Sequence, residues 1–361
     1  MEHLAIDGFR CFASLEIGGL RRLNLIAGKN GAGKSALLEA VQLFLRPDID
    51  SLTEVLDWRG QVAPSSPKPV WTEDTVGPLF HARGETVQGK IELRSGSSSV
   101  RFRIGHGLFD EKGNWFEAPA RNRADLKPAL VVQSTVDSKN SALPILLDGT
   151  LDFDRHPARM ADASRTFLRK ARRDQHRLYH VHAAGWDPDG LGGMLENVLG
   201  SAHQRTVIGA MQWLIPSAEF VFTKGRADLR AVYVRSSDFA VAQPLESFGD
   251  GAVRLAGIVL AVLLSRNGTC LIDEVESGLH YSLFPDLWRL LDKLSRDLSV
   301  QVFATTHSRD CLDAFAEASA EKDFDAAFYR LERNPGGAVE AVRLDYEGYF
   351  RRVEGLPFEV R

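Results

Sequence analysis

Apolar residues follow two different spacings along the chain, and each spacing predicts its own kind of element. Near the start, three short apolar runs separated by turns predict strands over 4–9, 13–17 and 23–27. After the third run, apolar residues recur at three- and four-residue intervals and predict a helix from Ser35 to about Leu45. The first part of the chain therefore predicts a strand, a glycine-containing loop and a helix in succession.

The pattern changes twice in the middle of the chain. Residues 79–135 alternate apolar and polar positions, which is typical of antiparallel strands. Residues 155–215 hold few strand formers and many Arg, Ala and Leu, so we expect a helical insertion there. The strand–helix rhythm of a parallel sheet then returns, with elements expected over 251–264, 270–272, 282–294 and 300–305.

Together these patterns predict an α/β fold with a mixed sheet, an antiparallel β lobe and a helical insertion. The chain has 361 residues, enough for one large domain or two joined domains. We expect three segments: an N-terminal part over 1–135, a helical basic insertion over 136–216, and a C-terminal part over 217–361.

Composition and charge exclude several classes of protein. Hydrophobic residues make up 44% and charged residues 25% of the chain, which is typical of globular proteins. The longest apolar stretch, 255–264, is shorter than the roughly 18 residues of a membrane-spanning helix, and the N-terminus lacks a secretory signal. We therefore expect a cytoplasmic protein with no membrane partner. The net charge of -4 gives no overall attraction to nucleic acid, so such a contact needs a local basic face.

The loop after the third strand carries the pattern G-x-x-x-x-G-K-S. Glycines in such a loop let backbone N–H groups converge on phosphate oxygens at the start of a helix. Lys34 then reaches the β and γ phosphates, and Ser35 ligates Mg2+. The pattern predicts ATP and Mg2+ as cofactors, and its residues are Gly28, Lys29, Asn30, Gly31, Ala32, Gly33, Lys34 and Ser35.

Polar residues at two later strand ends are candidates for hydrolysis. Asp273 and Glu274 follow the apolar strand 270–272. We expect Asp273 to hold Mg2+ and Glu274 to act as the general base on the attacking water. His307 follows the next strand, where a histidine can reach the γ phosphate. The expected catalytic residues are therefore Glu274, His307 and Lys34.

Another polar segment, 245–251, stands immediately before the long apolar helix. A serine hydroxyl and free N–H groups at a helix N-terminus form an anion site. Ser247, Gly249 and Gly251 therefore predict a second phosphate contact. Without the P-loop, the same segment would favour a plain helix cap and turn.

The order of these motifs resembles the ABC-type ATPases of the SMC, RecF and OLD group, and in particular compact OLD-like ATPases of bacterial defence systems. The resemblance covers 1–46 and 245–310, including Gly8-Phe9-Arg10 and the segment 273–280. In that group ATP lies between the P-loop of one subunit and the signature serine of another. The resemblance thus implies a head-to-head homodimer, or a higher homo-oligomer, with Ser247 acting in trans. It also implies that 276–280 crosses the dimer interface and that His307 is the switch histidine.

Departures from the group narrow what the resemblance implies. The signature has Phe248 and Asp250 where a transporter ATPase would have glycines, and no long heptad repeat separates the motifs. Neither a transporter subunit nor a chromosome-organising arm is therefore expected. Carboxylates after His307 are scattered, so we expect no attached Toprim nuclease. A magnesium-contacting glutamine is also implied, and its candidates are Gln61, Gln88 and, in place of a glutamine, His81.

Arginines cluster within the expected insertion. A helix there would place several of them on one positive face that can neutralise phosphates. Double-stranded DNA is the candidate ligand of this face, whereas a solvated face or an acidic protein partner explains it equally well. The candidate nucleic-acid residues are Arg165, Arg169, Arg172 and Arg173.

Two hypotheses for function follow. The first is a Mg2+-dependent ATPase that dimerises head-to-head on ATP and drives or gates a DNA-related effector, a nuclease or toxin acting in trans, in anti-phage defence or repair. The second is a nucleotide-gated scaffold or sensor that assembles and restrains a toxin or nuclease, with hydrolysis acting only as a timer. Replacing Glu274 by Ala separates them, because a scaffold should keep its partner and its activity when hydrolysis stops.

Overall fold

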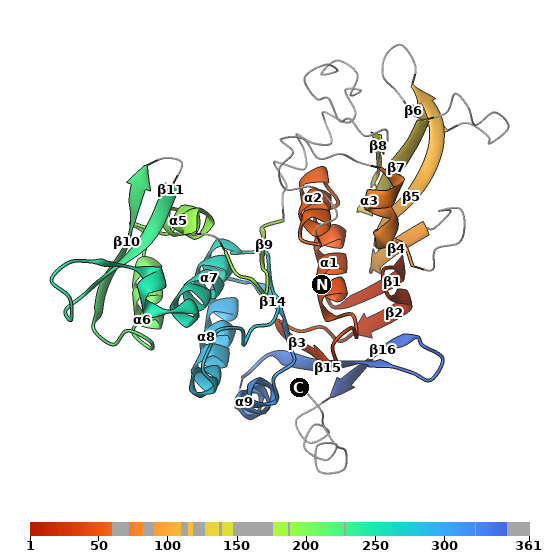
Figure 1. Cartoon of the computed structure of the whole chain (residues 1–361). Helices are drawn as coiled ribbons and strands as arrows, with labels where there is room; N and C mark the ends of the chain where they lie inside the picture. Colours follow the sequence, from red (N-terminus) through yellow and green to blue (C-terminus); the bar gives the residue numbers. More distant parts are fainter. Residues whose placement is uncertain are drawn as a thin grey trace. The chain divides into compact units, whose positions relative to one another are not determined.

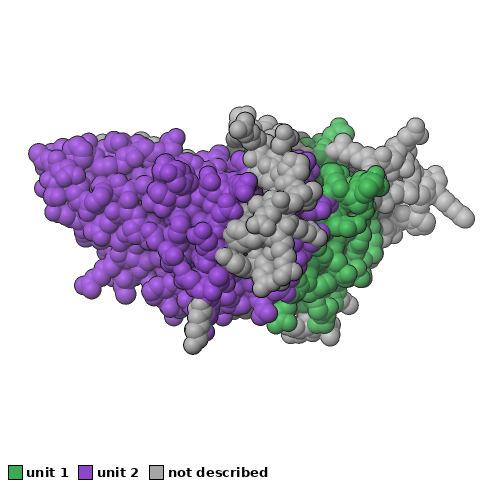
Figure 2. Space-filling view, turned by 90° about the horizontal axis from the view of Figure 1, so that it is seen from below, with its two compact units in different colours: residues 1–19, 35–175, 333–341 green, residues 20–34, 176–332, 342–361 purple. Residues whose placement is uncertain are grey.

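The computed structural model describes most of the chain as two compact units, which Figure 2 colours green and purple. Unit 1 comprises 1–19, 35–175 and 333–341, and unit 2 comprises 20–34, 176–332 and 342–361. The described residues are 1–59, 72–81, 90–109, 115–117, 127–136, 139–146, 176–186, 188–226, 229–321 and 323–344.

An antiparallel sheet forms the larger part of unit 1 (Figure 1). Its strands pair in the order β2-β1-β4-β5-β7-β8, and β6 adds to β5. The alternating pattern that predicts these strands places Ile91, Leu93 and Val100 in the core. The elements of this unit are β1 (His3–Phe9), β2 (Phe12–Gly18), α1 (Lys34–Leu45), α2 (Ile49–Asp57), α3 (Glu73–Val76), β4 (Lys90–Ser95), β5 (Ser98–Phe109), β6 (Trp115–Glu117), β7 (Lys127–Val136) and β8 (Lys139–Leu146).

A second sheet, largely in unit 2, has the order β16-β15-β3-β14-β13-β9. Four successive pairs within it, from β15 to β9, are parallel. The carboxyl ends of β3, β14 and β13 are therefore neighbours at one edge, which is where ligands bind in sheets of this kind. The strands are β3 (Leu23–Gly28), β9 (Leu178–Val181), β13 (Thr269–Ile272), β14 (Gln301–Thr306), β15 (Ala326–Arg333) and β16 (Val339–Leu344).

Helices and a small sheet complete unit 2. The long helix α7 buries almost every side chain between Ala252 and Leu263 and packs on β9 and β13, while α8 packs on β3 and α9 (Figure 1). A helix that is apolar on all sides belongs in a protein core, so α7 is the centre of this unit. The remaining elements are α5 (Pro188–Glu196), α6 (Gln204–Met211), β10 (Ala218–Arg226), β11 (Leu229–Ser236), β12 (Gln243–Pro244), α7 (Asp250–Leu264), α8 (Phe284–Asp297) and α9 (Arg309–Ser319).

The predicted α/β class with its antiparallel lobe is confirmed. The helix expected over 282–294 begins two residues later as α8, because a short 3-10 turn, Tyr281–Leu283, precedes it and Pro285 lies in its first turn. Much of the expected insertion, 147–175, lies outside the described residues. None of the helices in the described ranges is long and apolar enough to span a membrane.

Candidate functional site

The loop between β3 and α1 has the backbone that its glycines predict. Gly28 has φ 154 and Gly33 has φ 103, both in the region that favours glycine. A Cβ atom at Gly28 would lie 2.8 Å from the carbonyl oxygen of Leu331 on β15. This position therefore accepts glycine only, because β3 packs closely against β15 there.

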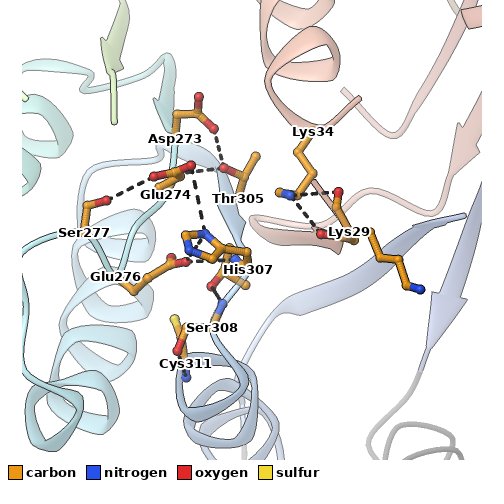
Figure 3. Close-up of polar contacts among 12 residues, drawn as sticks. Lys29, Lys34, Asp273, Glu274, Glu276, Ser277, Thr305, His307, Ser308 and Cys311 are labelled. Atoms are coloured by element: carbon orange, nitrogen blue, oxygen red, sulfur yellow. Dashed lines mark hydrogen bonds and ion pairs between the residues drawn. The ribbon is translucent and has the colours of Figure 1, made fainter. Parts of the chain in front are cut away.

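Lys34 is buried within the loop that it ends. Its Nζ atom donates hydrogen bonds to the carbonyl oxygens of Gly28, at 2.8 Å, and Lys29, at 3.3 Å (Figure 3). Burial lowers the pKa of Lys34, and the negative charges of Asp273, Glu274 and Glu276 oppose this shift. A cation that is held by carbonyl oxygens in a poorly hydrated loop is well suited to bind phosphate oxygens instead.

The turn after β13 carries the predicted carboxylates. Thr305, fully buried at the end of β14, donates its hydroxyl proton to Asp273 and accepts a hydrogen bond from the backbone N–H of Glu274 at 2.8 Å. Asp273 is 5% exposed, whereas the Glu274 side chain is 39% exposed. Glu274 has φ 49, a left-handed conformation that is uncommon for a residue with a side chain. Such strain is typical of functional turns.

His307 stands between these carboxylates and α9. Its Nδ1 atom lies 4.0 Å from Oε1 of Glu274 and 2.9 Å from Oε1 of Glu276 (Figure 3). The backbone N–H of His307 donates to the same Glu276 oxygen at 2.8 Å. The predicted catalytic residues Lys34, Glu274 and His307 thus all lie at the carboxyl ends of neighbouring strands in unit 2.

One residue of this region was not predicted from the sequence. The guanidinium of Arg254, on α7, donates hydrogen bonds to the carbonyl oxygens of His182 and Asp273, and of Glu274 at 2.8 Å. Burial lowers the pKa of Arg254, and Asp273, Glu276 and Glu274 oppose the shift. Arg254 therefore links α7 to the left-handed turn at Glu274. Its position inside an otherwise apolar helix was the signal in the sequence.

The predicted phosphate contact before α7 is exposed. Ser247 lies in a short 3-10 helix, Leu245–Phe248, and Gly249, with φ 91, is the N-cap of α7. A Cβ atom at Gly251 would approach the carbonyl oxygen of Gly278 to 2.7 Å. The signature segment is thus packed against the turn that follows Glu276, and Ser247 remains accessible to a ligand.

The remaining candidates are not among the unit 2 residues described above. His81 is held in unit 1 by the turn after β1, where its Nδ1 atom lies 2.8 Å from the carbonyl oxygen of Arg10. The two candidate glutamines, Gln61 and Gln88, lie outside the described residues, as do Arg165, Arg169, Arg172 and Arg173.

Comparisons with known proteins agree with this geometry. Residues 23–312 match the AAA_21 family, described as AAA domain, putative AbiEii toxin, Type IV TA system. Because this match covers most of the chain and every strand end described above, the chain belongs to that family.

Individual relatives are more distant. The chain is 23% identical over 351 residues, 90% of each chain, to a Helicobacter pylori protein named ATP/GTP phosphatase. An Smc head domain from Pyrococcus furiosus, solved with the C-terminal domain of ScpA, is 11% identical with a TM-score of 0.50, covering 98% of both chains. Another Smc head, bound to the C-winged helix domain of ScpA, is 14% identical with a TM-score of 0.49 and covers 97% of this chain and 99% of that one. The chain accordingly shares the fold of the Pyrococcus furiosus Smc head domain.

Proposed function

We propose that this protein hydrolyses ATP in a Mg2+-dependent reaction. The observation that carries the proposal is the meeting, at the carboxyl ends of β3, β13 and β14, of a buried lysine, a carboxylate pair and a histidine. The Helicobacter pylori relative named ATP/GTP phosphatase supports the same chemistry. Lys34 and the amides of Gly28 to Gly33 would hold the phosphates, because they combine positive charge with converging N–H donors.

The residues present fit a magnesium ion. Within unit 2, Asp273 would supply an oxygen ligand, the type that Mg2+ prefers, and it lies near enough to Lys34 to act on the charge of that side chain. The described residues contain no cluster of three or more side chains that could hold a metal alone. This agrees with Mg2+ bound together with a nucleotide, which needs only one or two carboxylates besides the phosphates. When bound, the ion would neutralise charge on the phosphates.

Glu274 is proposed as the general base. Its carboxylate is partly exposed, lies 3.2 Å from the Ser277 hydroxyl, and comes from a turn that Arg254 and Thr305 hold in place. A positioned carboxylate can take a proton from an attacking water molecule, and such catalysis contributes about 10²–10⁴-fold in rate.

We further propose that ATP closes a head-to-head homodimer. Ser247 and Gly249 are exposed at the start of α7, so they are available to a phosphate held by a second copy. Hydrolysis would then open the dimer and drive or gate a nuclease or toxin acting in trans. The family description, which includes a toxin–antitoxin system, supports such a partner. The arginine cluster supports double-stranded DNA as the ligand that triggers hydrolysis.

The test compares the wild type with Glu274→Gln in ATP hydrolysis and in size by light scattering, with and without double-stranded DNA. We expect the variant to hydrolyse at least about 100-fold more slowly and to stay dimeric with ATP. Turnover of the wild type should rise with DNA. A constant oligomer without a DNA response would contradict the DNA-driven dimer and favour the nucleotide-gated scaffold.

A further inference from the structure

One buried carboxylate holds both the backbone and the ring of His307. Oε1 of Glu276 accepts a hydrogen bond from the His307 backbone N–H at 2.8 Å and lies 2.9 Å from the ring Nδ1 (Figure 3). The Glu276 side chain is 9% exposed and that of His307 is 39% exposed. The carboxylate thus contacts the inner edge of a ring whose remainder is open to a ligand.

Stability does not explain a carboxylate at this position. Burying a charge is costly unless all of its oxygens are paired, and Oε2 of Glu276 is buried without a hydrogen-bond partner among the described residues. Glu276 also acts on the charges of Lys34 and Arg254, but Asp273 and Glu274 act on both of them too. The contact of Glu276 that neither Asp273 nor Glu274 shares is the hydrogen bond that it accepts from the His307 backbone N–H.

A second carboxylate competes for the same ring nitrogen. Oε1 of Glu274 lies 4.0 Å from Nδ1 of His307, against 2.9 Å for Glu276. If Glu276 were absent, a small rotation of the ring would let Nδ1 pair with Glu274. The proposed general base would then be occupied by the histidine instead of by water.

We propose that Glu276 is a positioning residue that fixes the orientation and tautomer of His307. Its negative charge, 2.9 Å from Nδ1, favours a ring proton on that nitrogen and leaves Nε2 for the nucleotide. It also keeps the ring away from Glu274. This role rests on the proposed ATPase function, because an oriented His307 affects hydrolysis only if the protein hydrolyses ATP.

Two variants and a matched control test this role through hydrolysis and stability. Glu276→Ala should lower kcat about tenfold, the usual effect of losing a residue that orients a functional histidine. KM for ATP should stay within about twofold, because the P-loop is untouched. Glu276→Gln keeps an acceptor for the His307 N–H, so it should lose less activity and should keep the Tm of the wild type. Asp292→Asn, which changes another buried carboxylate of unit 2, should leave kcat unchanged.

Ring nitrogen NMR shifts of His307, assigned with His307→Gln, give a readout that is independent of hydrolysis. We expect a single ring state with the proton on Nδ1 in the wild type, and a different or averaged state in Glu276→Ala. The same ring state in both proteins, or an unchanged kcat in Glu276→Ala, would overturn the proposal. A wild type without any ATP turnover would instead contradict the proposed function, and the ring state would still decide whether Glu276 positions His307.

Discussion

Two buried glutamates, one in each unit, use their charge in opposite ways. Glu39 on α1 in unit 1 is 2% exposed and pairs with two arginines, Arg10 through Oε2 and Arg59 through Oε1 at 2.7 Å. Glu276 in unit 2 has no arginine or lysine within ion-pair distance among the described residues and faces His307 instead. The Glu39 carboxylate contacts two guanidinium groups, whereas the Glu276 carboxylate contacts the partly exposed ring of His307 through one oxygen.

The difference shows what each buried charge stabilises. Arg10, in a left-handed conformation with φ 51, begins the turn after β1, and its backbone N–H donates a hydrogen bond to the carbonyl oxygen of Leu79 at 2.7 Å. Burial raises the pKa of Glu39, and Arg10 and Arg59 oppose that shift. Glu39 thus joins α1 to the β1–β2 turn and serves the fold. After β13, by contrast, the Glu274 side chain is 39% exposed, as a site that binds a charged ligand requires.

The largest expected change in stability lies in unit 1. Glu39→Ala leaves Arg10 buried and unpaired, so we expect the free energy of unfolding to fall by about 3–5 kcal/mol. Urea unfolding followed by circular dichroism measures this. Glu16→Ala removes a glutamate whose side chain is 77% exposed and should cost less than about 1 kcal/mol. Equal losses in the two variants would contradict a structural role for Glu39.

A smaller loss of stability, but a loss of activity, is expected at Arg254. Arg254→Met keeps the apolar packing of α7 but removes the donors to three backbone carbonyl groups, at a cost of about 1–3 kcal/mol. ATP hydrolysis should fall by about tenfold or more because the turn at Glu274 loses its support. Arg289→Met, at a half-exposed ion pair on α8, should leave both quantities nearly unchanged. Wild-type hydrolysis by Arg254→Met would show that Glu274 keeps its position without this contact.

A third effect on stability is expected at Gly251, where the backbone packs closely against Gly278. In Gly251→Ala the added Cβ meets the Gly278 carbonyl oxygen, a backbone atom that cannot move cheaply, so we expect a loss of about 1–3 kcal/mol. Gly209→Ala is the matched control, since Gly209 lies inside α6 with nothing within 4 Å of its would-be Cβ. That variant should gain about 0.5–1 kcal/mol. If both variants behave alike in thermal unfolding, the close approach of 251 to 278 is wrong.

The smallest expected difference between the units is in the reactivity of their cysteine thiols. Burial raises the pKa of Cys270 to about 12 and that of Cys311 well above its usual value, so both are protonated at pH 8 in the folded protein. Cys11 in unit 1 is half-buried, and burial raises its pKa as well. Iodoacetamide should therefore label Cys11 slowly and the other two only after unfolding, as mass spectrometry of peptides can show. Labelling of Cys270 in the folded protein would contradict the buried position of β13.

The sequence could predict those parts of the site that depend on local pattern. The P-loop needs only a strand, glycines and a helix in succession, and the ends of β13 and β14 follow from short apolar runs before Asp273 and His307. Contacts between distant residues carry no such pattern. Arg254 meets the carbonyl oxygen of His182, and Glu276 meets His307, only because β9, β13 and β14 are adjacent in the sheet. The strand order, which decides these contacts, is not encoded in any single segment.

The most direct test of the central claim, that the strand ends of unit 2 form a nucleotide-hydrolysing site, is phosphate release by the wild type and by Lys34→Ala. Both proteins would be assayed with ATP and with GTP, in Mg2+ and in excess chelator, after thermal unfolding has shown that the variant folds. We predict Mg2+-dependent turnover by the wild type and a loss of at least about 100-fold in Lys34→Ala. Equal turnover in the two proteins, or no Mg2+-dependent turnover of either nucleotide by the wild type, would contradict the claim.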